Sequence, residues 1–516
     1  MRKIVWILCV CLLFAGFSGC GQDSAYVPTG DGLADYTQQT QAYNVTAPGA
    51  LQEESQPYSI AYYAEDGFNP YLCENYTNRL AFSLIYQGLF AVDKDYNVEP
   101  VLCKSYTVSE DMKTYTFRLE SATFSDGSYL SAEDVVASLE AAEDSDYYTG
   151  RFDHVARISS ESTNTVTITM DCAFENLPLL LDIPIVKKEQ VGDEAPLGTG
   201  PYHLVNTAGG LALQQRSNWW CSAQLPTSTK SIQMWAAQSP AQIRDRFEFE
   251  DLGIAYTDPG AASYVDYRCD YEVWDCETGI FLYLGCNTES SVFSNDEVRA
   301  ALTYAIDRGR LLEECYNGFG QTATLPASPS SPYYDKGLAS QVTFEPERLR
   351  QALSNQGMIG KKVVLLVNKS DSVRLQAARL IGEMLTECGL EVEIQDNSTR
   401  YYREELLTDN YDLYLGQTKL SANMDLSAFF APYGALSHGD MDDAACYSMC
   451  LEALENSGNY YNLYQMILKD GQLTPILFRT YAVYAERGLM SGLSPSRDNV
   501  FWYSLGKTMN DAYAIE

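Results

Sequence analysis

A strand–helix–strand pattern in the second half constrains the fold of this chain more than any other feature. Residues 363–367 form a continuous apolar run, as expected for a strand that is buried on both faces. Apolar residues then recur at helical spacing over 373–385, Gly389 ends the helix, and residues 390–394 return as a second strand. Such a βαβ unit has parallel strands and a right-handed crossover. The chain is therefore expected to have an α/β fold, with residues 411–415 as one more strand of the same sheet.

The stretch from Phe293 to Arg308, FSNDEVRAALTYAIDR, has the pattern of a capped amphipathic helix. Ser294 and Glu297 are spaced as a capping box, in which each side chain accepts the main-chain amide of the other residue. Apolar residues at 298, 301, 302, 305 and 306 form one stripe behind the cap. Arg308 is expected in the last turn, where a cation suits the helix dipole. The pattern alone predicts no more than a packed surface helix.

The N-terminus carries an export signal. Arg2 and Lys3 precede an almost unbroken apolar run over residues 4–17, which is too short for a membrane-spanning helix. Small residues directly before Cys20 make residues 1–20 look like a bacterial lipoprotein signal, with Cys20 lipidated as the new N-terminus. An ordinary cleaved signal with an unmodified cysteine is the alternative. Residues 21–57 are rich in Gln, Thr, Ser, Gly and Asp, and we interpret them as a flexible tether.

Charge and composition exclude some classes of partner. The formal net charge of −34 argues against nucleic acid, whose phosphates require a basic face. At 516 residues and 46% hydrophobic content, the chain has material for about three domains with their own cores. After the tether no stretch is long and apolar enough to span a membrane.

The cysteines do not form a recognisable framework. Three of the 14 lie in the signal and its anchor, and the remaining 11 are scattered and odd in number. Cys446 and Cys450 are one helical turn apart, which is too far for an unstrained disulfide. A metal site made by these two with His438 and Asp440 is conceivable, but the spacing lacks CxxC or HxxxH. No metal site and no cofactor are therefore assigned.

Seven short motifs follow one another after the tether. They are FNP at 68–70, IYQGL at 85–89, YTFRL at 115–119, FSDG at 124–127, SAEDV at 131–135, GTGPY at 198–202, and the helix at 293–308. In this order they resemble the family 5 extracellular solute-binding proteins, which are the dipeptide-, oligopeptide- and nickel-binding components of ABC importers. The patterns themselves predict a helix at 80–85 before Gly88, alternating strands at 115–119 and 166–170, a Ser131–Asp134 capping box, and strands at 476–478 and 481–484.

The resemblance implies a two-lobed periplasmic-binding-protein-like fold, type II and cluster C-like, with an extra domain inserted in the first lobe. The first lobe is then expected to comprise residues 58–90, 195–285 and 473–516. The inserted domain would be 91–194 and the second lobe 286–472.

The resemblance also suggests ligand-binding residues. In peptide-binding members, an aspartate in a segment like GWxxDYPDPxxFL receives the terminal ammonium of the ligand, and a buried ammonium requires such a carboxylate. Here Gln417 stands where the family has Trp, and Asp425 matches the second aspartate at a spacing two residues longer. A helix N-cap before residues 426–430 is the alternative role of Asp425. Asn69, Tyr86 and Tyr202 are further candidates because they belong to matching motifs, and the 38 tyrosines suit peptide, sugar or aromatic ligands alike.

We therefore expect a monomeric, extracytoplasmic solute-binding lipoprotein, anchored by lipid at Cys20 to the outer face of the cytoplasmic membrane. It would capture a small solute, an oligopeptide in the first instance, and deliver it to ABC permease subunits. The alternatives are a lipoprotein that senses peptides without transport, a binder of nickel complexes or oligosaccharides, and, ranked last, a secreted glycoside hydrolase. The sequence has no GxSxG or HExxH motif and three histidines, which argues against an enzyme.

Overall fold

The predicted strand–helix–strand unit is present and lies inside a larger sheet. β14 (Lys362–Asn368) and β15 (Glu391–Asn397) pair in parallel and are joined by α9 (Ser372–Glu387). β16 (Leu413–Lys419) pairs in parallel with the other edge of β14, so the strand predicted near 411–415 belongs to the same sheet. Residues of β14 are buried on both sides of the strand, as its apolar run predicted. The prediction of an α/β fold is confirmed.

The computed structural model describes residues 59–148, 150–227, 229–249, 252–260, 267–490, 492–497 and 499–502. All of them belong to one unit of the chain, Ser55–Glu516. The signal and Cys20 lie outside the described residues, as does the tether. Within the described ranges, no helix combines the length and the apolar character that crossing a bilayer requires.

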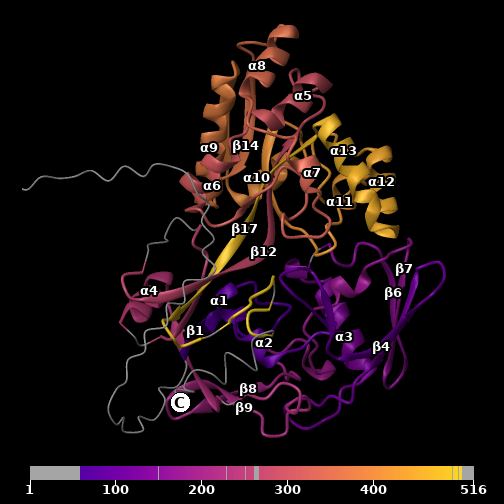
Figure 1. Cartoon of the computed structure of the whole chain (residues 1–516), viewed down its shortest axis with the longest axis vertical. Coiled ribbons are helices and arrows are strands. Elements are labelled where there is room, and N and C mark those ends of the chain that lie inside the picture. The colour runs from indigo at the N-terminus through magenta and orange to yellow at the C-terminus, as the bar shows by residue number, and fades with distance from the viewer. Residues whose placement is uncertain are drawn as a thin grey trace, which may run out of the picture. The chain divides into compact units, whose positions relative to one another are not determined.

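One eleven-stranded sheet joins most of the described strands. Its order is β15-β14-β16-β12-β17-β11-β1-β10-β9-β8, and β13 pairs with β17 off this path. The strands not yet bounded are β1 (Ser59–Tyr63), β8 (Tyr202–Thr207), β9 (Gly210–Gln215), β10 (Ser231–Ala237), β11 (Ile254–Thr257), β12 (Tyr271–Cys286), β13 (Gln321–Thr322) and β17 (Leu473–Glu486). We call the part built on β1 and β8–β11 the first lobe, and the part built on β14–β16 the second lobe. Both long strands, β12 and β17, run through the two lobes (Figure 1).

The two shared strands change register where they pass between the lobes. The β12–β17 pairing shifts between Glu277 and Phe281. Gly279 lies in this bulge with φ 72°, a conformation that side chains with a Cβ rarely adopt. A Cβ there would also lie 2.1 Å from a guanidinium nitrogen of Arg497. The bulge is thus a backbone irregularity at the place where a hinge between the lobes would bend.

A second, smaller sheet lies within the residues predicted to form the inserted domain. Its order is β4 (Cys103–Val108), β5 (Thr114–Leu119), β7 (Thr165–Met170) and β6 (Val155–Ser162), all antiparallel. The alternation predicted for 115–119 is confirmed, because Tyr115, Phe117 and Leu119 are buried while their neighbours are more exposed. The strand predicted at 166–170 is also confirmed. The domain boundaries themselves stay predictions.

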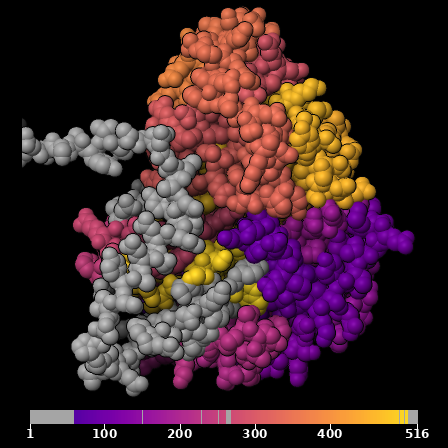
Figure 2. Space-filling view, viewed as in Figure 1, coloured from indigo at the N-terminus to yellow at the C-terminus, as the bar shows by residue number. Residues whose placement is uncertain are grey.

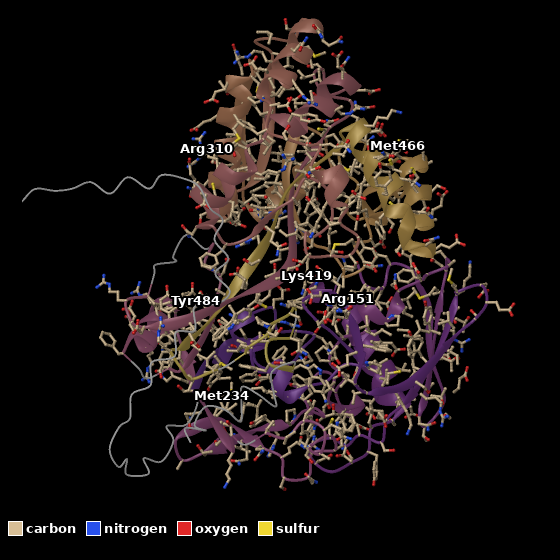
Figure 3. All side chains as sticks on the ribbon, in the orientation of Figure 1. Arg151, Met234, Arg310, Lys419, Met466 and Tyr484 are labelled. Atoms are coloured by element: carbon tan, nitrogen blue, oxygen red, sulfur yellow. The ribbon has the colours of Figure 1, made fainter. Side chains whose placement is uncertain are left out.

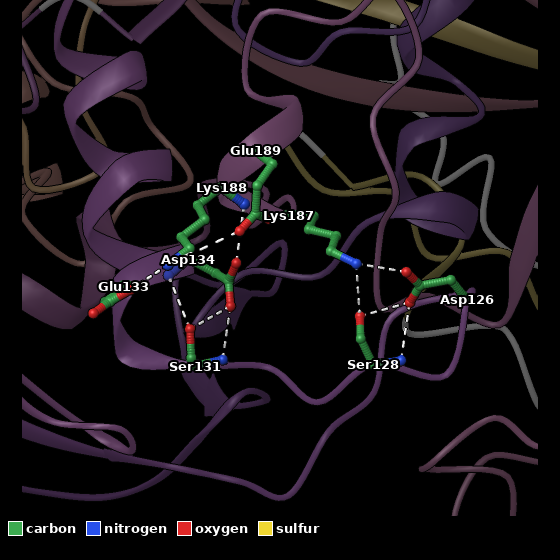
Figure 4. A network of polar contacts seen from close by, with 8 residues as sticks. All are labelled: Asp126, Ser128, Ser131, Glu133, Asp134, Lys187, Lys188 and Glu189. Carbon is green, nitrogen blue, oxygen red and sulfur yellow. Dashed lines mark hydrogen bonds and ion pairs between the residues drawn. The ribbon is translucent and has the colours of Figure 1, made fainter.

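The polar network of Figure 4 ties this part together. The predicted capping box is present: the Asp134 amide donates to Ser131 Oγ, and the Ser131 amide donates to the Asp134 carboxylate at 2.8 Å. The main-chain amide of Lys188 donates to the same carboxylate at 2.9 Å. Lys187 Nζ donates to Asp126 at 2.6 Å. Charge-assisted hydrogen bonds thereby join the segment at Lys187 and Lys188 to the start of α3 and to the turn at Asp126.

The remaining elements pack on these sheets. The helices are α1 (Tyr76–Arg79), α2 (Phe82–Ile85), α3 (Ala132–Glu143), α4 (Pro240–Glu248), α5 (Asp296–Leu302), α6 (Arg308–Tyr316), α7 (Lys336–Ala339), α8 (Pro346–Asn355), α10 (Thr399–Leu406), α11 (Ser427–Phe430), α12 (Ala444–Glu455) and α13 (Tyr460–Asp470). Short 3-10 turns are η1 (Ala64–Asp66), η2 (Asp146–Tyr148), η3 (Leu177–Leu180), η4 (Lys188–Gln190), η5 (Thr303–Ala305) and η6 (Ser457–Asn459), and β2 (Phe90–Val92) pairs with β3 (Val98–Pro100). In Figure 2 the yellow surface of α12 and α13 lies against the purple surface below it. The Glu175 amide donates to the Leu454 carbonyl at 2.8 Å.

The prediction of one helix over 293–308 is wrong about the N-cap residue and about the C-terminal end. α5 is capped by Asn295, whose side chain accepts the Val298 amide, and not by Ser294. The Glu297 carboxylate instead accepts hydrogen bonds from the side chains of two residues at the end of α8. Ile306 is extended, and Asp307 caps a separate helix, α6.

Arg308 therefore starts α6 instead of ending the preceding helix. Its guanidinium is buried and donates to the main-chain carbonyls of Ala323 and Pro475 at 3.0 and 2.9 Å. The cation holds three segments of main chain together, which local sequence could not reveal.

The cysteines and the C-terminal strands agree with the sequence analysis. Cys446 and Cys450 are free thiols, as their spacing predicted. The two strands predicted at 476–478 and 481–484 are parts of one strand, β17. Of the helix predicted at 80–85, residues 82–85 form α2, whereas Leu80 and Ala81 separate α2 from the preceding helix α1.

Candidate functional site

A hollow of about 570 Å³ lies where β17 passes the first lobe. It is enclosed by η1, α1, α4 and β11, together with one residue of β17. Its lining residues are Tyr63, Glu65, Asp66, Glu74, Asn75, Tyr76, Thr77, Pro240, Ala241, Ile243, Arg244, Tyr256, Thr257, Asp258, Tyr267 and Tyr481. Aromatic and acidic side chains dominate this set. A hollow of this size is suited to a small organic solute.

Four tyrosines pack together at the hollow, and three of them line it; we call the four the tyrosine cluster. Tyr76 lies at its centre, with ring centroids 4.4 Å from Tyr481 and 6.1 Å from Tyr256. Tyr147 of η2 completes the cluster at 5.9 Å from Tyr76. Three of these pairs meet edge to face or tilted, which is a favourable geometry for aromatic rings. The cluster combines residues from the first lobe, from β17 and from the predicted inserted domain.

Lys419 brings the second lobe to this cluster. Its ammonium nitrogen lies 3.6 Å from the ring centroid of Tyr147, a cation–π contact. Figure 3 labels Lys419 where the second-lobe ribbon meets the indigo and purple elements. Because β16 carries Lys419 while η2 carries Tyr147, this contact spans two parts of the fold.

A buried ion pair lies behind the cluster. Arg479 of β17 is paired with Asp258, and their side chains are 8% and 23% exposed. Arg479 also donates to Gln417 Oε1 at 3.4 Å. Burial raises the pKa of the Asp258 carboxyl, and the Arg479 guanidinium opposes that shift. Burial alone would lower the pKa of Arg479, but the negative charge of Asp258 outweighs it and raises that pKa.

The outer rim of the hollow is acidic. Glu65, Asp66 and Glu74 line it, and the cation among the lining residues, Arg244, is already paired with Asp245 at 2.8 Å. The hollow thus presents carboxylates on one side, whereas Lys419 contacts the tyrosine cluster on the other. Such an arrangement fits a ligand with both a cationic and an anionic group.

Three of the residues suggested by motif are held by main-chain partners outside this hollow. Asn69 donates to the carbonyls of residues 191 and 193 at 2.8 and 2.7 Å. The Tyr86 hydroxyl donates to the Phe68 carbonyl at 2.7 Å, and that of Tyr202 donates to the Thr229 carbonyl at 2.8 Å. All three side chains are buried. In this conformation they fix turns and strands, and they do not line the hollow.

Asp425 lies at a different contact between the predicted inserted domain and the second lobe. Its Oδ2 is 3.4 Å from His154 Nε2, and its Oδ1 accepts the Ser427 amide at 2.8 Å. Both side chains of the ion pair are buried, 6% exposed for His154 and 7% for Asp425. Burial alone would lower the pKa of His154, but the hydrogen bond to Asp425 and the neighbouring Cys172 raise it to about 11. Asp425 thus already has the His154 imidazole as a partner. The N-cap of α11 is Leu426, so the N-cap role considered for Asp425 is wrong, and its role as an ammonium partner stays a prediction.

The structure brings together two groups of side chains that could hold a metal. Among the described residues these are His154 with Asp171 and Cys172, and Cys446 with Asp443 and Asp470. His438 and Asp440, which the sequence suggested beside Cys446, belong to neither group. Instead the His438 ring packs 5.8 Å from that of Tyr414, and burial lowers its pKa.

Of the residues suggested by the sequence, Gln417 contacts Arg479 next to this site, and most of the site was missed. Tyr76, Tyr147 and Arg479 are separated by up to about 400 positions along the chain, and no motif joined them. One signal was available: Arg479 is a cation inside an otherwise apolar strand, ILFRTYAVY. A charge buried in a strand requires a partner of opposite charge. Buried ionisable groups of this kind are found disproportionately at functional sites.

Comparison with known proteins identifies the kind of molecule that has this architecture. A family model described as bacterial extracellular solute-binding proteins, family 5 Middle, matches residues 97–440. The glutathione-binding protein GsiB of Escherichia coli is 27% identical over 344 residues, which cover 63% of this chain and 66% of GsiB. The match thus spans just under two thirds of the length of that relative.

Solved structures agree in fold. The oligopeptide-binding protein AppA from Bacillus subtilis, in complex with a nonapeptide, has a TM-score of 0.62 and 18% identity, covering 88% of this chain and 99% of AppA. NikA from Brucella suis, in complex with Fe(III)-EDTA, has a TM-score of 0.70 and 17% identity, covering 86% of this chain and 99% of NikA. At these identities the likeness concerns the fold, which is that of two-lobed periplasmic binding proteins.

Proposed function

Because the chain belongs to the family 5 bacterial extracellular solute-binding proteins, we propose that it captures a peptide-like solute and delivers it to the permease of an ABC importer. The observation that carries this proposal is the hollow of about 570 Å³, which is lined by tyrosines and lies beside the strands shared by both lobes. The family comprises binding proteins and not enzymes, in agreement with the sequence analysis. The names of its relatives, glutathione-binding and oligopeptide-binding, support a peptide-like solute.

The chemistry of the hollow supports the same class of solute. Tyrosine rings offer flat apolar surfaces with polar tips, which suit peptide groups and side chains without selecting one sequence. The acidic rim of Glu65, Asp66 and Glu74 would receive a cationic end of the solute. Lys419, which contacts the tyrosine cluster, would attract an anionic end, whereas Arg479 is already paired with Asp258 and holds Gln417 beside it.

Binding would act by closing the two lobes. Solute held between Tyr76 of the first lobe and Lys419 of β16 would add contacts that the open form lacks. A ligand shifts an equilibrium between two forms only by such a difference in its interactions with them. The bulge at Gly279 is our candidate for the bending point. Asp425 is already paired with His154, so a ligand ammonium would reach it only by displacing the imidazole.

Lipid modification of Cys20 is part of the proposal and places the protein at the outer face of the cytoplasmic membrane. Mass spectrometry of the mature N-terminus tests it directly. A diacylglycerol adduct on a chain beginning at residue 20 is expected, and an unmodified cysteine would refute the anchor.

A thermal-shift screen tests the solute class. Free peptides, N-acetylated peptides, nickel complexes and oligosaccharides are each added to the purified protein. A ligand at 100 times its dissociation constant stabilises the native state by about 2.7 kcal/mol. We expect free peptides to raise the melting temperature in a concentration-dependent way. Stabilisation by nickel complexes or oligosaccharides alone would refute the peptide class.

A transport assay separates an importer from a sensor. Cells that carry the protein with its permease should accumulate labelled peptide, and deletion of the gene for this protein should abolish that uptake. Binding without any loss of uptake on deletion would instead support a sensing role.

A further inference from the structure

Three metal-binding side chains meet at one end of the β6–β7 hairpin, away from the solute hollow. His154 directly precedes β6, and Asp171 and Cys172 directly follow β7. Val155 pairs with Met170 in this hairpin, so the two ends lie side by side. The Asp171 amide donates to the His154 carbonyl at 3.0 Å and fixes the main chain at this point.

The ligand atoms of these side chains already lie close together. His154 Nδ1 is 3.1 Å from Asp171 Oδ1, and one ligand atom of each of the three residues lies within 4.8 Å of the others. Ligand atoms around a tetrahedral zinc ion lie about 3.4 Å apart, given bonds of about 2.1 Å to nitrogen and oxygen and about 2.3 Å to sulfur. Small side-chain rotations therefore suffice to bring all three onto one ion. Asp171 is 55% exposed on its side chain and leaves an open path to solvent.

The other nitrogen of the imidazole is oriented as in a metal-binding histidine. His154 Nε2 lies 3.0 Å from Ser427 Oγ and 3.4 Å from Asp425 Oδ2. Metal-ligating histidines almost always donate their second N–H to a carboxylate, carbonyl or water, which fixes the tautomer and raises ligand basicity. Here a buried carboxylate and a hydroxyl face Nε2, and Nδ1 faces Asp171.

We propose that His154 Nδ1, Asp171 and Cys172 bind one divalent transition-metal ion of the zinc type, with Asp425 orienting the histidine. Imidazole, thiolate and carboxylate together suit zinc, and three protein ligands leave a fourth position for water. Metal ligands must be deprotonated, so binding of the ion would release protons. One thiolate and one carboxylate balance its double charge.

The surrounding charges are compatible with a cation. Asp153 and Asp425 add negative charge near the imidazole. Lys113 is the opposing group on the exposed side, where its Nζ donates to the main-chain carbonyl of Asp171 at 2.8 Å. That ammonium is held by a carbonyl and does not contact the Asp171 carboxylate in any described interaction.

The proposed ion would also strengthen the contact between two parts of the fold. It would be held by the β6–β7 hairpin, while the ligated imidazole donates to Asp425 and Ser427 at the start of α11. None of the three ligands lines the solute hollow. The inference is therefore independent of the solute proposal.

The test uses the purified protein, reduced with a phosphine and stripped with EDTA. Zinc is titrated in competition with a chromophoric chelator, and cobalt(II) serves as a spectroscopic probe. We expect one equivalent of tightly bound zinc and a near-ultraviolet thiolate-to-cobalt charge-transfer band. Cys172→Ser should abolish the band, and Asp171→Asn should weaken zinc binding by at least about tenfold. Both side chains are partly exposed, so both variants should fold.

Two further variants separate this site from other sources of binding. Cys269→Ser, at a similarly half-buried cysteine outside the cluster, should leave the band and the affinity unchanged. Asp425→Asn should keep the thiolate band but weaken zinc binding by about 10–100-fold. Absence of the band would overturn the proposal. The proposal would also be refuted if Cys172→Ser bound zinc as tightly as the wild type, or if Cys446→Ser lost zinc binding. In either case the ion would lie elsewhere.

Discussion

Replacement of Arg479 by methionine tests the buried ion pair behind the tyrosine cluster. Methionine keeps the apolar stem of the side chain but removes the charge that faces Asp258. Two unit charges about 4 Å apart interact by about 4 kcal/mol at an effective dielectric constant of about 20. Because the Asp258 side chain is 23% exposed, solvent screens part of this energy. We expect Arg479→Met to lower the free energy of unfolding by about 2–4 kcal/mol, in the range for breaking a buried pair.

The effect of pH on this variant has a definite sign. Burial raises the pKa of Asp258, and in Arg479→Met no guanidinium opposes that shift. A carboxyl whose folded pKa is raised contributes stability below its unfolded pKa of about 3.9, and that contribution is lost as the pH rises through the folded value. The deficit of the variant should thus be smallest in acid and reach its full size at neutral pH.

Denaturant unfolding of a double-mutant cycle provides the assay. Asp258→Asn and the double variant Asp258→Asn/Arg479→Met complete the cycle, which isolates the energy of the pair. The double variant should be within about 1–2 kcal/mol of the wild type, because no unpaired charge is left buried. If Arg479→Met unfolds with a free energy within about 0.5 kcal/mol of the wild type, or if the losses simply add, the reasoning is refuted.

Three other perturbations have defined outcomes. The bond from Lys187 lowers the pKa of Asp126, against its partial burial, to about 2. The stabilisation that the Lys187–Asp126 pair gives the folded state is complete above the ordinary carboxyl pKa of 3.8. It is lost as the pH falls through the folded pKa of about 2. Lys187→Met should therefore cost up to about 1 kcal/mol at pH 7 and nothing near pH 2 in urea titrations, and an equal deficit at both would contradict this. Gly471→Ala should lower the melting temperature strongly, because a Cβ at this position would lie 2.4 Å from the main chain of α5. The φ of Gly471 is 65°, and this left-handed conformation alone costs a residue with a Cβ about 1–2 kcal/mol. Ser131→Ala removes the cap on the Asp134 amide and should cost about 1 kcal/mol by calorimetry, whereas no change would mean that the cap is not formed in solution.

Local patterns predicted the elements whose geometry is set by their own sequence. The apolar run at 363–367 and the helical spacing at 373–385 specified a βαβ unit because each period is a property of one segment. The Ser131–Asp134 box was found for the same reason. Where two caps compete, local pattern fails. Ser294 and Asn295 are adjacent and both can cap, and only the packed structure shows that Asn295 does so.

The site could be predicted only in part because it depends on contacts between distant segments. Tyr76 and Tyr147 come together through folding of parts that no short motif connects. Asn69 and Tyr86 were suggested because they belong to motifs, yet their side chains bind main-chain carbonyls. Motif residues here specify the framework of the fold, while the candidate contacts with solute come from residues between the motifs.

Calorimetric titration of a peptide into the wild type and into Tyr76→Ala tests the central claim most directly. Tyr76 contacts the other three rings of the tyrosine cluster and lines the hollow, and its side chain is only partly buried, so its removal should spare the fold. Tyr433→Ala, at a fully exposed tyrosine outside the hollow, is the control. We predict that Tyr76→Ala weakens binding by about tenfold or more, corresponding to about 1.4 kcal/mol, while Tyr433→Ala binds as the wild type does. Equal affinity in all three proteins would place the solute elsewhere and contradict the account.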